Sequence, residues 1–166
     1  MQVSKAVNKS LAMGLDVGST TVKVVVLDGD NQILYNSYRR HYSDVENSVE
    51  EILEEVYRNL GEFEATMAVT GSGGLMVHKW LDIPFVQEVI ACSMAVEELI
   101  PETDVAIELG GEDAKITYFS GSMEQRMNGS CAGGTGAFID QMADLIETDA
   151  SGLNELAKSH ANIYPI

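Results

Sequence analysis

Two short segments of the chain combine a carboxylate, glycines, hydroxyls and a lysine in an order suited to binding phosphate. The first is LDVGSTTVK, residues 15–23. Glycine allows a phosphate chain to approach closely, amides and hydroxyls bond its oxygens, lysine adds positive charge, and a carboxylate holds Mg²⁺ or its waters. The residues that supply these groups are Asp16, Gly18, Ser19, Thr20 and Lys23. No Walker loop is present, and an ordinary hairpin with an aspartate at a strand end explains the segment equally well.

The second segment, IELGGEDAK at residues 107–115, repeats this order of acid, glycine turn and lysine. Its candidate phosphate-binding and metal-positioning residues are Glu108, Gly110, Gly111 and Asp113. One such segment is a weak signal. Two in succession are stronger, because two facing hairpins could hold one polyphosphate and its metal from both sides.

Cys131 lies in NGSCAGGTG, residues 128–136, a run of small and polar residues before an apolar helical segment. A thiolate or an anionic iron–sulfur cluster is stabilised just before a helix by the unpaired N–H groups and the helix dipole. The residues alone favour this ligand role no more than a chance cysteine in a loop. Cys92 lies in a mostly apolar helical segment, where a buried structural thiol is the better interpretation.

The elements that must position the first segment begin with β-rich runs separated by turns. Gly18 falls in the first turn, and the second turn is DGDN, residues 28–31. A fourth run ends in GSGG, residues 71–74. The predicted strands are 11–17, 22–27, 33–39 and 65–70.

Two helices are predicted beside these strands. A capping box formed by Ser43 and Glu46 starts the first, whose apolar residues recur at helical spacing until Gly61, a C-cap. The second covers about 86–99 and is closed by Pro101.

The pattern then begins again, which suggests a structural duplication. Runs 104–109 and 114–119 flank the second glycine turn, and a third run covers 122–127. A glycine-rich loop then enters a helix over about 135–146. No obvious sequence repeat accompanies this order, so the inference rests on topology.

The charge balance excludes some classes of partner. With 10 Lys plus Arg against 26 Asp plus Glu, the net charge is −16, and general binding to nucleic acid phosphates is improbable. No apolar run approaches the roughly 18 residues that a membrane span needs. No secretory signal is evident, and two cysteines cannot make a disulfide framework. We therefore expect a cytoplasmic protein that binds no membrane.

Four segments together, LDVGSTTVK, AVTGSGG, ELGGEDAKI and NGSCAGGTGAFIDQMA, resemble the BadF/BadG/BcrA/BcrD family. More narrowly they resemble the activators of 2-hydroxyacyl-CoA dehydratases, within the superfamily of acetate and sugar kinases, heat-shock chaperones and actin. The resemblance runs from about Leu11 to the last residue. It implies an α/β ribonuclease-H-like (actin-type ATPase) fold, with mixed sheets and flanking helices. We expect a first subdomain at 11–101 and the start of a second, truncated one at 102–166.

The resemblance also implies an activity. Members of the family are homodimers that hold one [4Fe-4S] cluster between subunits, with two cysteines from each. They use ATP hydrolysis, with Mg²⁺, to drive a low-potential electron from a ferredoxin- or flavodoxin-like donor into a 2-hydroxyacyl-CoA dehydratase or related CoA-ester reductase. Carried over by motif, Asp16 and Glu108 position metal and water, and Cys131 ligates iron. The phosphates would meet Gly18, Ser19, Thr20, Lys23, Gly110, Gly111 and Asp113, with ADP as the product.

Two departures from the family pattern affect these expectations. Glu108 and Glu112 stand where the well-known activators have aspartate and glutamine. The family's second cysteine, well past Cys131, is absent. We therefore expect this chain to be the N-terminal fragment of a longer protein, with weak or no ATP hydrolysis alone.

Two other functions fit the same segments. A small-molecule kinase of the superfamily, acting on a sugar or an acid, would give Cys131 no role. A non-enzymatic, actin-like nucleotide-binding scaffold would need no metal–thiolate chemistry.

Overall fold

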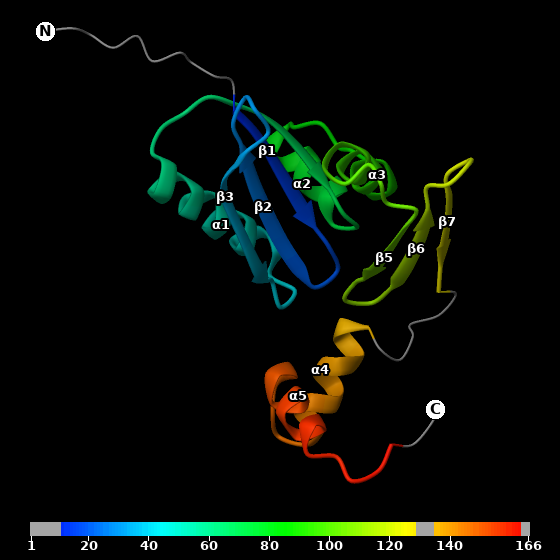
Figure 1. Cartoon of the computed structure of the whole chain (residues 1–166). Coiled ribbons are helices and arrows are strands. Elements are labelled where there is room, and N and C mark those ends of the chain that lie inside the picture. The colour runs from blue at the N-terminus through cyan, green and yellow to red at the C-terminus, as the bar shows by residue number, and fades with distance from the viewer. Residues whose placement is uncertain (1–10, 129–134, 164–166) are drawn as a thin grey trace, which may run out of the picture. The chain divides into compact units, whose positions relative to one another are not determined.

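The structure is a computed structural model that describes residues 11–128 and 135–163. The chain divides into two compact units, Met1–Glu102 and Thr103–Ile166 (Figure 1).

The first unit is built on a mixed four-stranded sheet in the order β3-β2-β1-β4. β1, β2 and β3 are antiparallel neighbours, whereas β4 runs parallel to β1. The predicted meander and fourth strand are thus confirmed, with bounds that differ by one residue at two ends. The strands are β1 (Leu11–Val17), β2 (Thr21–Leu27), β3 (Ile33–Arg40) and β4 (Ala65–Thr70).

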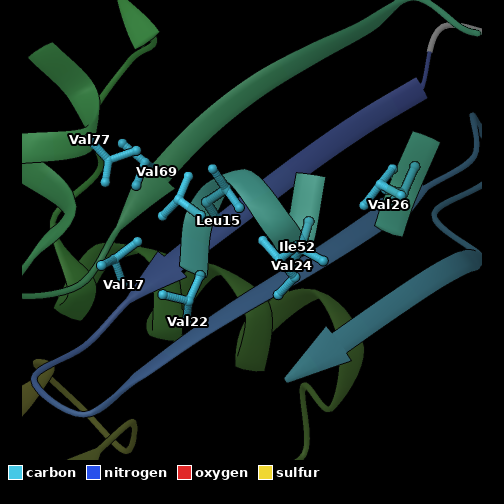
Figure 2. Packing of buried hydrophobic residues seen from close by; sticks show 10 residues of the cluster. Leu15, Val17, Val22, Val24, Val26, Ile52, Val69 and Val77 are labelled. Atoms are coloured by element: carbon cyan, nitrogen blue, oxygen red, sulfur yellow. The ribbon is translucent and has the colours of Figure 1, made fainter. Parts of the chain in front are cut away.

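Helix α1 (Val45–Leu60) packs against β2 and β3 and closes the core of this unit. Its buried apolar residues, Val49, Ile52 and Val56, recur at intervals of three and four residues, so they share one face. They meet the strand residues whose side chains alternate onto the same side of the sheet (Figure 2). The buried strand residues of this core are Leu15, Val17, Val22, Val24, Val26 and Val69.

We expect Ile52→Ala to lower the free energy of unfolding by about 2–5 kcal/mol, because the fully buried side chain would leave a cavity. Glu54→Ala, on the exposed face of the same helix, should change it by less than about 0.5 kcal/mol. Urea denaturation of both variants measures the difference. Equal effects would contradict this assignment of the core.

The start of α1 differs from the prediction. Asp44, not Ser43, is the N-cap, and its side chain accepts a hydrogen bond from the Asn47 N–H. Ser43 instead adopts a left-handed conformation with φ 69°. The predicted C-cap, Gly61 with φ 74°, is confirmed.

The region after β4 contains two helices where the sequence predicted one. α2 (Gly74–Leu81) starts directly after the glycine-rich segment, and α3 (Glu88–Leu99) matches the predicted helix. Between them the chain runs back along β4. The Val69 N–H donates a hydrogen bond to the Pro84 carbonyl, and the Val86 N–H donates to the Val69 carbonyl. The sequence marked these glycines only as the end of the fourth run, but a Cβ at Gly74 would lie 3.1 Å from the Phe85 ring. This glycine therefore permits close packing inside a helix.

The second unit contains an antiparallel sheet in the order β5-β6-β7, followed by two helices in contact with each other. The predicted strands and the first helix are present with slightly shorter bounds. The second helix was not predicted, although Asp149 caps it by accepting from the Gly152 N–H. The elements are β5 (Val105–Leu109), β6 (Ala114–Tyr118), β7 (Glu124–Met127), α4 (Gly136–Leu145) and α5 (Ala150–Lys158). Among the described residues, no helix has the length and apolar character to cross a membrane.

Candidate functional site

The first glycine turn joins β1 to β2 and holds a carboxylate beside an ammonium group. The Gly18 N–H donates to the Thr21 carbonyl at 2.9 Å and closes the turn. Asp16 and Lys23 face each other across the two strands, and Lys23 Nζ lies 2.6 Å from Asp16 Oδ2. Both side chains are partly exposed, at 31% for Asp16 and 45% for Lys23. Because such a pair contributes only about 0–1 kcal/mol, an incoming phosphate or cation can replace either partner at low cost.

A glycine-rich segment after β4 packs directly on this turn. Thr70 lies opposite Asp16 in the parallel register, and the Gly73 N–H donates to the Val17 carbonyl at 2.8 Å. A Cβ at Gly71 would lie 2.3 Å from the Val17 carbonyl oxygen and 2.6 Å from Asp16 Oδ1. Only glycine fits there. In the sequence this segment ends a predicted strand and contributes to the family resemblance, but no pattern there predicts its position beside Asp16.

One polar atom in this part of the site has no partner among the described residues. The Thr70 hydroxyl oxygen is buried and makes no hydrogen bond there. A buried hydroxyl without a partner is unfavourable by about 1–3 kcal/mol, so it is a candidate to bind a water or ligand oxygen beside Asp16.

The second glycine turn joins β5 to β6 and repeats the arrangement of the first. The Gly110 N–H donates to the Asp113 carbonyl at 2.8 Å, and Glu108 faces Lys115 across the strands. Lys115 Nζ lies 3.5 Å from Glu108 Oε1 and 3.4 Å from Asp113 Oδ2. The Lys115 side chain is only 8% exposed, so the two carboxylates neutralise a buried charge. Lys115 was part of the quoted segment but was not predicted as a site residue.

The two turns share one geometry. In each, a carboxylate at position i is followed by a glycine at i+2, whose N–H donates to the carbonyl of residue i+5. In each, the lysine at i+7 is the cross-strand partner of the carboxylate. The match in hydrogen bonding and register supports a structural duplication more firmly than element order alone. The binding of one polyphosphate by both turns stays a prediction, because the turns belong to different compact units.

Helix α4 begins at the second turn. The Gly136 N–H donates to the Gly110 carbonyl at 3.0 Å, and the Ala137 N–H donates to the Gly111 carbonyl at 2.7 Å. Thr135, immediately before the helix, is 1% exposed, and its hydroxyl makes no hydrogen bond within the described residues. Cys131 lies four residues earlier, outside the described residues. Cys92 lies on α3 and is partly rather than fully buried, so the expected fully buried thiol is not found.

The sequence and the structure were both compared with known proteins. A family model described as the BadF/BadG/BcrA/BcrD ATPase family matches residues 13–162. The chain belongs to this family. The resemblance inferred from the four segments is thereby confirmed.

Two curated relatives of this BadF/BadG/BcrA/BcrD family member are dehydratase activators. The chain is 32% identical over 157 residues to the 2-hydroxyisocaproyl-CoA dehydratase activator of Clostridioides difficile, covering 90% of this chain and 58% of that protein. It is 33% identical over 153 residues to the (R)-2-hydroxyglutaryl-CoA dehydratase activating ATPase of Acidaminococcus fermentans, covering 89% and 58%. The chain therefore spans a little over half the length of these relatives.

Solved structures of the same two kinds of protein share the fold. The C. difficile activator with bound ADPNP matches with a TM-score of 0.79 and 31% identity, over 94% of this chain and 59% of that one. Component A of the A. fermentans dehydratase matches with a TM-score of 0.81 and 26% identity, over 95% and 62%. This family member thus has the predicted α/β actin-like ATPase fold, over about 60% of the length of those chains.

The donor groups of the first turn suit a magnesium–nucleotide complex. No three His, Cys, Asp or Glu side chains gather to hold a metal ion in the described part of the chain. Mg²⁺ does not require such a cage, because it keeps several waters and binds through one or two carboxylates together with substrate phosphates. Asp16 fits that mode of binding, because Gly71 beside it has no side chain to displace the carboxylate.

Proposed function

We propose that this chain is the part of an ATP-hydrolysing, iron–sulfur activator that carries both phosphate-binding turns and one cluster-ligating cysteine. The complete protein would deliver a low-potential electron to a 2-hydroxyacyl-CoA dehydratase or a related CoA-ester reductase. The observation that carries the proposal is the repeated turn geometry of carboxylate, glycine and cross-strand lysine. It occurs in a chain about one-third identical to proteins named as dehydratase activators.

The proposed chemistry is hydrolysis of a phosphoanhydride, in which a protein acts by positioning and by neutralising charge. Backbone N–H groups of the turns, the hydroxyls of Ser19 and Thr20, and the Lys23 ammonium would bind phosphate oxygens. Asp16 and Glu108 would orient water from the two sides. Mg²⁺ would offset phosphate charge when bound. The related C. difficile structure with bound ADPNP supports nucleotide binding, and its location at these turns is part of the proposal.

The proposed iron site involves Cys131. One thiolate from each of two subunits supplies two of the four ligands that a [4Fe-4S] cluster usually takes, so further ligands must come from elsewhere. The cluster would supply the low-potential electron. The buried Thr135 and the anchored start of α4 provide a fixed helix terminus just after Cys131, which suits an anionic cluster. A homodimer, a ferredoxin- or flavodoxin-like donor and a cytoplasmic location complete the proposal.

Replacement of Cys131 by alanine tests this assignment in the complete protein. After anaerobic reconstitution with iron and sulfide, the unmodified protein should show the brown colour and broad absorption of an iron–sulfur cluster. Cys131→Ala should lose both, together with electron transfer to a dehydratase.

Cys92→Ala is the matched control, since this thiol lies on α3, and it should keep the absorption. A small-molecule kinase would retain full phosphoryl transfer in Cys131→Ala. A nucleotide-binding scaffold would stay colourless in every form. Either result would replace the proposed function with that alternative.

A further inference from the structure

His41 is a buried histidine that contacts the first glycine turn from a distant part of the sequence. It follows the last residue of β3 and lies just before helix α1, and it is 6% exposed. In the sequence, the histidines have no metal-ligand spacing, and a structural or surface role is the default expectation for His41. The structure brings it against Gly18 and Thr20, which were predicted to bind phosphate.

Hydrogen bonds at the backbone N–H and at both ring nitrogens fix His41 in place. Its backbone N–H donates to the Thr20 carbonyl at 3.1 Å. The Ser43 N–H donates to ring Nδ1 at 3.0 Å, and ring Nε2 lies 3.2 Å from the Gly18 carbonyl oxygen. Because Nδ1 accepts, it carries no proton, and in the neutral ring the proton is on Nε2. Nε2–H therefore donates to Gly18.

This contact determines which way a peptide group of the turn faces. A trans peptide holds its C=O and the following N–H in opposite directions. With the Gly18 carbonyl directed at His41, the Ser19 N–H is directed to the other side of the turn. A carbonyl presented to a phosphate would repel it, whereas an N–H binds it. The orientation of this one peptide therefore adds either an attractive N–H or a repulsive carbonyl to the turn.

The segment after His41 is also held in an uncommon conformation. Tyr42 and Ser43 both have left-handed backbone angles, with φ 46° and 69°. L-residues adopt this conformation when neighbouring contacts enforce it. The Ser43 N–H bond to Nδ1 is one such contact, and the Asp44 N–H bond to the His41 carbonyl at 2.7 Å is another. The sharp return of the chain thus places the imidazole against the turn.

We propose that His41 is a positioning residue for phosphate binding: its Nε2–H holds the Gly18 carbonyl away and presents the Ser19 N–H to the nucleotide. This inference rests on the proposed nucleotide site at the first turn. It adds to that site a residue that lies outside the first glycine turn and acts through the backbone of the turn.

Two substitutions separate the two ring nitrogens. Glutamine places an amide N–H close to the position of Nε2 and keeps the donor to Gly18, whereas asparagine places its oxygen near Nδ1 and keeps only the acceptor for Ser43. The dissociation constant for Mg-ADPNP and the melting temperature are measured for the complete protein carrying each change. We expect His41→Asn and His41→Ala to weaken binding about tenfold, as loss of one bond at a charged ligand does. His41→Gln should bind within about threefold of the unmodified protein.

His78→Ala is the matched control for His41→Ala. His78 also hydrogen-bonds a backbone carbonyl, that of Ile83, in the same unit. This control substitution should lower the melting temperature without weakening the binding of Mg-ADPNP. The inference is overturned if His41→Ala binds normally, or if the Gln and Asn variants lose affinity and melting temperature equally. If the unmodified protein binds no Mg-ADPNP, the proposed nucleotide site fails and this inference fails with it.

Discussion

ATP hydrolysis by the complete protein is expected to fall by about 10²–10³-fold when Asp16 is replaced by asparagine, the loss typical of one preorganised charge-stabilising group. The amide has the size of the carboxylate, so the packing against Gly71 and the strand register are retained. The substitution removes the negative charge that lies beside Lys23 and that would bind the proposed magnesium ion. Melting temperature should therefore change little while the rate constant falls.

Steady-state phosphate release measures this effect, with Mg²⁺ varied over a wide range. A raised requirement for Mg²⁺ in Asp16→Asn would show that the carboxylate acts through the metal. Asp30→Asn is the control, because Asp30 is an exposed acid in the turn at the other end of β2. A rate of hydrolysis for Asp16→Asn within twofold of that of the unmodified protein would contradict the proposed role of Asp16.

Gly71→Ala should lower the free energy of unfolding by about 2–5 kcal/mol, the sum of overpacking and left-handed strain. The new Cβ would lie 2.3 Å from the Val17 carbonyl oxygen, which is backbone and cannot turn aside. It would also lie 2.6 Å from Asp16 Oδ1, at a residue with φ 91°. We expect ATP hydrolysis to fall as well, since Asp16 must move.

Gly61→Ala provides the matched control for this substitution. Gly61 has φ 74° and nothing within 4 Å of the position a Cβ would take. It shares the conformational cost of about 1 kcal/mol but makes no clash. Chemical denaturation of both variants isolates the contribution of the contact. Equal destabilisation would contradict the close packing of the glycine-rich segment on the turn.

The parts of the site that sequence predicted are those fixed by local spacing. A carboxylate, a glycine two residues on and a lysine seven residues on must lie together once the segment forms a hairpin. Short hairpins have few possible registers, so pattern and geometry agree. The same reasoning predicted β1 to β4 and α1, where the apolar period is clear.

The parts that sequence did not predict depend on contacts between distant segments. His41 meets Gly18 only because β3 returns antiparallel to β2, and no local pattern marks it. Gly71 is beside Asp16 only because β4 joins β1 in parallel. The start of α2 was missed because glycine is a poor helix former, and its packing role at Gly74 appears only in three dimensions. For α1, Ser43 was expected as the N-cap, but its backbone N–H donates to His41 Nδ1 instead.

The parallel pairing of β1 with β4 has a consequence for how the first unit folds. The β1–β2 hairpin closes over a short loop. The pairing of Leu11 with Ala65, in contrast, joins residues that are separated in sequence by β2, β3 and α1. Contacts of such long sequence separation carry a larger loop-closure entropy and form late. A chain emerging from the ribosome would thus hold the Asp16–Lys23 hairpin before the Gly71 segment arrives. A nucleotide at the proposed site would stabilise the state in which both segments are in place and would slow the opening of β4 from β1.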